Sequence, residues 1–140
     1  MSRFTSDEIG YLTGGDRRLA RIATIGADGT PHVTPVGHSY NADLDTIDGG
    51  GRNLTATKKY RDLTTYPKVA IVVDDVPPPW KPRGVEIRGH AEAVAEPEAV
   101  IRIHPERIIS WGLDTDDLHH RNARTVTDTK AAAGDEVART

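Results

Sequence analysis

The residues of this 140-residue chain best suited to chemistry lie directly after a glycine run. Hydroxyl and basic side chains follow Gly49-Gly50-Gly51-Arg52, and they are Thr55, Thr57, Lys58, Lys59 and Arg61. The first turn of a helix presents unpaired N–H groups and a partial positive charge, both of which favour an anion. If a helix begins in this segment, the pattern predicts that it binds the phosphate group of a ligand.

A solvated helix face is the alternative interpretation of the same segment. Lys58 and Asp62 are spaced to pair along one side of a helix. Such an exposed pair contributes only a few tenths of a kcal/mol and requires no ligand. On these residues alone, both interpretations stay open.

Histidines are the other candidates for acid–base chemistry, because imidazole titrates near neutral pH. They are His32, His38, His90 and His104, and none has a neighbour spaced for a metal site or a catalytic triad. We expect solvated histidines on strand faces, and we assign no catalytic residue and no metal ligand. Trp80 and Trp111 are expected to pack in the core or at a dimer contact, or to line a ring pocket.

Composition limits the partners of the chain. A formal net charge of −3 argues against a general nucleic-acid binder. The absence of cysteine excludes disulfides and thiolate-bound metals. No run approaches the roughly 20 apolar residues of a membrane span, and the first residues lack an apolar leader segment. We therefore expect a cytoplasmic protein that binds neither nucleic acid nor membrane.

The elements that must position these residues are mostly strands. Alternating or continuous apolar patterns predict strands at residues 19–25, 31–40, 46–48, 69–73 and 85–94, with a last pair at 101–103 and 108–111. A capping box of Thr5 and Glu8 predicts a short helix from Ser6 to about Gly14, and the basic helix is expected over residues 54–65. Residues 1–114 are predicted to form one cofactor-binding domain, and the polar residues 115–140 a mobile tail. This pattern predicts a mostly β fold with short helices, built as a small antiparallel barrel.

Five blocks of sequence, taken in their order and spacing, resemble a known family. They are residues 30–36, 59–63 with 66–67, 72–76, 83–92 and 101–112. Together they are similar to the FMN-binding split β-barrel proteins related to pyridoxamine 5′-phosphate oxidase. Within these, the chain looks most like the branch that uses the deazaflavin F420.

The resemblance implies a homodimer with the cofactor in a groove between two barrels. The strand backbone along the flavin-like ring would come from Val33, Thr34, Pro35 and Val36. The cofactor phosphate would be held by Thr57, Lys58, Lys59 and Arg61. Trp111 would approach the cofactor from the partner chain. The connection from Val94 to Ile101 is short for this family, so we expect an open substrate pocket.

The function that the resemblance implies is a reductase that uses reduced F420. A hydride would pass to an unsaturated or carbonyl-conjugated small molecule, with the chemistry supplied by the cofactor. An FMN-dependent oxidase or reductase on the same fold is the first alternative, because FMN and F420 carry the same ribityl phosphate. A non-catalytic carrier of F420 or a flavin is the second alternative.

Overall fold

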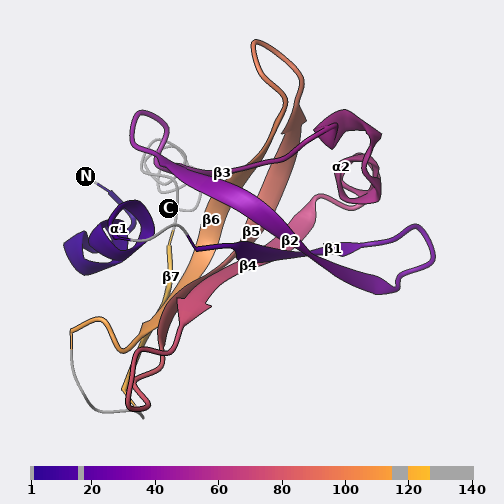
Figure 1. Ribbon diagram of the computed structural model, residues 1–140. Helices are drawn as coiled ribbons and strands as arrows, with labels where there is room; N and C mark the ends of the chain where they lie inside the picture. Colours follow the sequence, from indigo (N-terminus) through magenta and orange to yellow (C-terminus); the bar gives the residue numbers. More distant parts are fainter. Residues whose placement is uncertain (1, 16–17, 115–119, 127–140) are drawn as a thin grey trace, which may run out of the picture.

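The computed structural model describes residues 2–15, 18–114 and 120–126 (Figure 1). In chain order the described elements are α1 (Ser6–Thr13), β1 (Ala20–Ile25), β2 (Pro31–Asn41), β3 (Thr46–Gly50), the 3-10 turn η1 (Leu54–Ala56), α2 (Lys58–Asp62), β4 (Lys68–Asp75), β5 (Arg83–Val94), β6 (Val100–Trp111) and β7 (Arg121–Thr125). None of the described helices is long and apolar enough to span a membrane.

Six of the strands close into an antiparallel barrel. The sheet runs in the order β3-β2-β1-β4-β5-β6-β7, and a further pairing of β3 with β6 joins its ends. Three residue pairs make this closure: Ile47 with Ile103, Asp48 with Arg102, and Gly49 with Ile101. The predicted mostly β, antiparallel barrel is therefore confirmed. The homodimer stays a prediction, since one chain is described.

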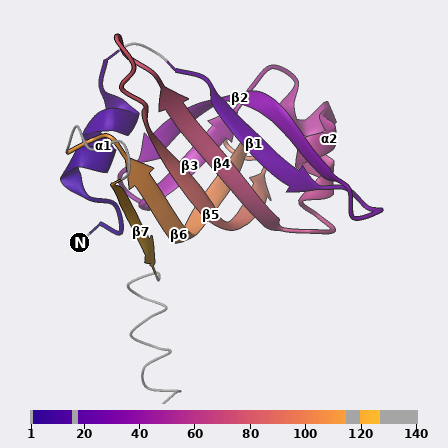
Figure 2. The same ribbon diagram turned by 90° about the horizontal axis from the view of Figure 1, so that it is seen from below.

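Isoleucines fill the centre of the barrel. Those with at most 1% exposure are Ile22, Ile47, Ile71, Ile87, Ile101, Ile103 and Ile108. Burying one such side chain contributes roughly 1.5–3 kcal/mol. The two helices lie at opposite ends of the barrel in both views (Figures 1 and 2). The core extends to both helices. Near α1 it includes Phe4, Tyr11 and Leu12, and around α2 it includes Leu54 and Leu63.

The capping box at the start of α1 is confirmed. The Glu8 amide donates to Thr5 Oγ1 at 3.1 Å, and the Thr5 amide donates to Glu8 Oε1 at 2.9 Å. These two bonds satisfy main-chain N–H groups that a helix start leaves open. Local chemistry alone therefore sets where α1 begins.

The predicted helix over residues 54–65 and the predicted last strand pair were both wrong in detail. Thr57 is extended (φ −81°, ψ 153°), so the basic segment divides into η1 and the five-residue α2. Residues 100–111 form the single strand β6, whose register with β5 shifts at Gly89. Because a Cβ at Gly89 would collide with the His104 carbonyl oxygen, glycine lets the two strands stay paired past Pro105.

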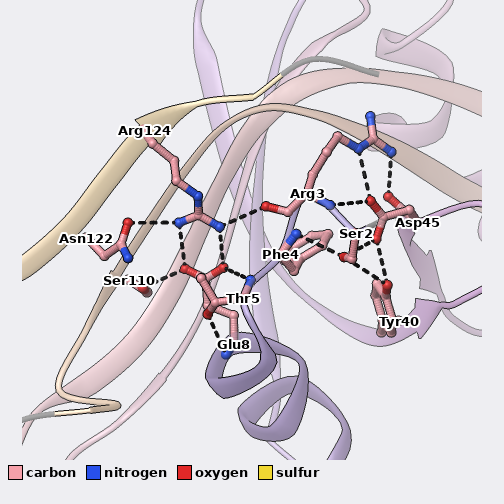
Figure 3. Close-up of polar contacts among 10 residues, drawn as sticks. All are labelled: Ser2, Arg3, Phe4, Thr5, Glu8, Tyr40, Asp45, Ser110, Asn122 and Arg124. Atoms are coloured by element: carbon pink, nitrogen blue, oxygen red, sulfur yellow. Dashed lines mark hydrogen bonds and ion pairs between the residues drawn. The ribbon is translucent and has the colours of Figure 1, made fainter. Parts of the chain in front are cut away.

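Part of the predicted mobile tail is a strand. Residues 121–125 form β7, which pairs with β6 from Arg107 to Trp111, so the prediction was wrong for these residues. The other tail residues, 115–119 and 127–140, lie outside the described residues. Figure 3 shows the contact that anchors β7: Arg124 reaches the buried carboxylate of Glu8 at 2.6 and 2.9 Å. A single ion pair therefore connects the last described strand to the first helix.

Candidate functional site

Strand β2 changes partner halfway along its length. Residues 31–36 pair with β1, and residues 37–41 pair with β3. Among the described strands, each half of β2 is thus paired along one edge only. The predicted ring-binding residues 33–36 lie in the first half, beside the edge that β3 leaves open. Pro35, which has no N–H group, lies in this half, as its chemistry requires.

The side chains of the predicted ring-binding residues point in different directions. Val33 is 67% exposed, and Thr34 and Pro35 are also exposed. Val36 is 4% exposed and belongs to the core. Val36 can therefore meet a ligand through its main chain only.

The predicted phosphate residues Thr57 and Lys58 already have partners in the chain. Thr57 Oγ1 donates to the Leu54 carbonyl oxygen at 2.6 Å and accepts from the Tyr60 amide at 3.4 Å, which makes Thr57 the N-cap of α2. Lys58 Nζ lies 3.0 and 3.3 Å from the two carboxylate oxygens of Asp62. For Lys58, the structure contains the ion pair with Asp62 that the spacing of the two residues predicted as one of the two interpretations.

Lys59 differs from its neighbours. In the part of the chain that the structure describes, no hydrogen bond or ion pair engages the Lys59 ammonium, and the side chain is half-buried. Arg61 Nη1 donates to the Ala56 carbonyl oxygen at 2.9 Å and otherwise faces solvent. The first two residues of α2 also have main-chain N–H groups without an acceptor inside the helix. Of the predicted phosphate residues, Lys59 is therefore the one whose charge no described side chain or carbonyl oxygen engages.

The structure brings α2 and β2 to one part of the barrel but leaves Trp111 elsewhere. α2 packs beside β1, the partner of the first half of β2 (Figure 2). Trp111 ends β6, with its ring against Gly84 and 5.2 Å from the Arg121 guanidinium. It lies eight residues beyond Ile103, where pairing with β3 ends, which is about 26 Å along the strand. Contact between Trp111 and a cofactor would therefore have to come from a second chain, and it stays a prediction.

Two hollows beside β2 were missed from the sequence. One of about 400 Å³ lies between the residues that follow α1, including Arg18 and Leu19, and residues 37–40 of β2. The other, of about 570 Å³, lies over β2, β3 and the connection between β5 and β6. Both are lined by Gly37, His38 and Ser39. The glycines were visible in the sequence, but the register that places Gly37 opposite Gly50 was not.

An ion pair forms one wall of the larger hollow. Arg102 Nε and Nη2 each lie 3.2 Å from a carboxylate oxygen of Asp48, and Asn41 and Thr46 donate to the same group. Burial by itself would raise the pKa of Asp48, but the bonds from Arg102, Asn41 and Thr46 outweigh it and hold the pKa below its usual range. Asp48 is therefore a fixed anion whose charge Arg102 balances.

Two of the other candidate histidines form surface pairs. The rings of His90 and His104 stack at 4.9 Å between centroids on β5 and β6. His90 contacts Glu106 at 3.1 Å, and His104 contacts Glu92 at 2.5 Å. No group of three or more histidine and acidic side chains among the described residues is arranged to hold a metal ion. Of the four histidines, only His38 lines the hollows beside β2.

The closed barrel, the half-paired β2 and the short basic helix together define a split β-barrel of the flavin-binding type. The chain belongs to the pyridoxamine 5′-phosphate oxidase family, whose model matches residues 14–137. It is 37% identical over 135 residues to the 5a,11a-dehydrotetracycline/5a,11a-dehydrooxytetracycline reductase of Streptomyces rimosus, covering 89% of this chain and 94% of that protein.

Solved structures share the fold. A conserved hypothetical protein from Mycobacterium tuberculosis superimposes with a TM-score of 0.67 at 22% identity, covering 93% of this chain and 99% of that one. An F420 reductase superimposes with a TM-score of 0.55 at 22% identity, covering 71% of this chain and 94% of that one. At these identities the likeness concerns the fold.

Proposed function

We propose that this chain is an F420-dependent reductase that acts on carbonyl-conjugated small molecules. That it is an oxidoreductase follows from its family and from the reductase with which it shares 37% identity. The observation that carries the choice of ligand is the open edge of β2 in the same part of the barrel as the unengaged ammonium of Lys59. A flat ring system and a phosphate, joined by a linker, fit those two features.

The residues on β2 and α2 fit such a cofactor. Val33, Thr34 and Pro35 are exposed beside unpaired main-chain groups, and Val36 adds its main chain. Lys59 and the first N–H groups of α2 supply positive charge for the phosphate. Arg61 lies two residues after Lys59 and so does not share its side of the helix, and Lys58 would have to leave Asp62 to take part.

When bound, reduced F420 would supply a hydride to the unsaturated carbon of the substrate, and a proton from water would complete the two-electron reduction. The chain contributes binding and orientation, and it excludes competing reactions. No described side chain is assigned as the acid. Because the Streptomyces relative is named for dehydrotetracyclines, conjugated carbonyls of that kind are the first substrates to test.

A second copy of the chain would complete the groove. The outer face around Val33 is apolar, with Ala23, Ala70 and Val72 lining a shallow hollow of about 250 Å³ between Arg21 and Glu86. Apolar residues that adjoin one another on an exposed sheet face form a patch of the kind that protein contacts cover. We infer that this face forms the homodimer, which would let Trp111 of the partner subunit approach the cofactor.

Paired titrations test the cofactor. The protein, freed of any cofactor, is titrated with F420 and with FMN while cofactor fluorescence is followed, and F420 is expected to bind more tightly. A charge-assisted contact contributes about 1.5–3 kcal/mol, so Lys59→Ala should weaken both ligands roughly tenfold to a hundredfold. Lys68→Ala, an exposed lysine at the start of β4, is the matched control and should change neither.

Each other outcome has a definite meaning. Unchanged affinity for both ligands in Lys59→Ala would place the phosphate elsewhere. Tighter binding of FMN would make the chain an FMN-dependent oxidase or reductase on the same fold. Binding of reduced F420 without its oxidation by menadione or 5a,11a-dehydrotetracycline would indicate a carrier.

A further inference from the structure

Two glycines face each other across β2 and β3 where the chain itself has no need of glycine. Gly37 pairs with Gly50, neither has a positive φ, and a Cβ on either would meet no heavy atom within 4 Å. Glycine inside a strand is destabilising, because it adds freedom to the unfolded chain and leaves nothing to pack. Gly84 is different, since a Cβ there would lie 2.7 Å from the Trp111 ring. The absence of side chains at Gly37 and Gly50 therefore affects only the space on that face of the sheet.

The larger hollow lies above this pair, and we call it the glycine hollow. Its floor is Gly37, Ser39, Gly50 and Gly51, and one wall is Arg102. Its volume of about 570 Å³ falls within the range of about 300–1,000 Å³ that is typical of small-molecule sites. Gly37 directly follows the ring-binding residues 33–36, so the hollow adjoins the proposed cofactor strand. A floor of bare main chain suits the flat face of a molecule.

The charges around the glycine hollow indicate which class of molecule can bind there. Arg102 balances Asp48, as described above. Glu96 and Glu98, from the connection between β5 and β6, are exposed and have no hydrogen bond or ion pair among the described residues. The rim is therefore negative. It disfavours a phosphate or a polyanionic tail and favours a neutral or positively charged occupant.

We propose that the glycine hollow is the substrate site of this enzyme and takes a flat conjugated-carbonyl molecule that is neutral or carries a basic group. The proposal rests on the proposed function, which places the reacting ring against the adjoining half of β2. The flat face of the substrate lies on the main chain of Gly37 and Gly50. Glu96 and Glu98 face its basic end.

Filling the hollow tests the proposal. Gly50→Leu adds a side chain into open space, so the fold should be kept, and Gly10→Leu on α1 is the matched control, because a Cβ there also meets nothing within 4 Å. The probes are menadione (neutral), 5a,11a-dehydrotetracycline (with a basic dimethylamino group) and naphthoquinone sulfonate (anionic). Their binding to the cofactor-free protein is measured by calorimetry, and kcat/KM is measured with reduced F420.

Gly50→Leu should weaken binding of the first two probes by about tenfold or more and lower kcat/KM by a similar factor. Its F420 affinity and its Tm should match those of Gly10→Leu. The double variant Glu96→Gln with Glu98→Gln should bind the anionic probe more tightly relative to the basic probe than wild type does. Three results would overturn the proposal. Gly50→Leu could bind the probes as tightly as wild type, it could lose affinity for F420 and not for the probes, or wild type could prefer the anionic probe. Failure of the proposed function is a separate result, in which wild-type protein oxidises reduced F420 with none of the three probes.

Discussion

Replacing Arg124 with alanine removes the guanidinium that pairs with a fully buried carboxylate. Glu8 is 0% exposed, whereas Arg124 is 26% exposed and also donates to the Arg3 carbonyl oxygen at 2.8 Å (Figure 3). In Arg124→Ala the Glu8 carboxylate keeps bonds from Ser110 at 2.6 Å and from the Thr5 amide at 2.9 Å. It loses its neutralising charge, so the folded state holds an uncompensated buried anion.

The size of the effect follows from this geometry. Removing one partner of a buried ion pair typically costs about 3–5 kcal/mol. The two remaining bonds to Glu8 and the partial exposure of Arg124 reduce the expected loss to the bottom of that range or just below it, at about 2–3 kcal/mol. For a chain of this length that loss lowers Tm by roughly 10 °C.

Urea unfolding followed by circular dichroism measures the loss directly. Arg107→Ala is the control, because Arg107 also joins β6 to β7, through a surface bond to Thr125 at 3.2 Å, and should lose less than about 0.5 kcal/mol. Adding Glu8→Gln to Arg124→Ala should restore about 1 kcal/mol or more, since no buried charge is then left unpaired. A loss within 0.5 kcal/mol of wild type for Arg124→Ala, or no recovery in the double variant, would refute this reasoning.

Two further predictions concern acid stability and assembly. Burial alone would raise the pKa of Glu8, but the bonds from Arg124, Ser110 and Thr5 lower it below its usual range. Protonation of Glu8 therefore favours unfolding. The free energy of unfolding of wild type measured in urea should exceed that of Glu8→Gln by its full margin at pH 6, and this margin should shrink as pH falls below about 5. A margin that stays constant down to about pH 3.5 would contradict this. Val33→Glu places a charge in the exposed apolar face and should yield monomers in sedimentation velocity. Leu44→Glu is the control, because Leu44 is an exposed apolar residue in the turn between β2 and β3 and does not line that face. A dimeric Val33→Glu would move the interface elsewhere.

Local chemistry made much of the fold predictable. The capping box of Thr5 and Glu8 fixed the start of α1, and the alternation over residues 85–94 marked β5. Along β1, β4 and β5 the buried residues alternate with less buried ones, so alternation and topology agree there. The paired state of Lys58 with Asp62 was also visible from spacing, as one of two interpretations.

The rest depends on contacts between distant residues. β7 is short and polar, and its place depends on Arg124 meeting Glu8 across the whole chain, so composition alone favoured a tail. The division of the basic helix follows from the extended conformation of Thr57, which no pattern indicated. The glycine hollow appears only when the register sets Gly37 opposite Gly50. Sequence patterns describe single elements well and the space between elements poorly.

The pairing of Gly37 with Gly50 has a consequence for how this enzyme can change. A Cβ introduced at either position would meet no heavy atom within 4 Å, so small side chains can change the volume and polarity of the site stepwise. Selection for a new substrate could then proceed without the loss of stability that usually accompanies altered specificity. Gly37 and Gly50, on the floor of the proposed substrate site, contribute no side chain to the barrel core, which makes the scaffold a favourable starting point for directed evolution.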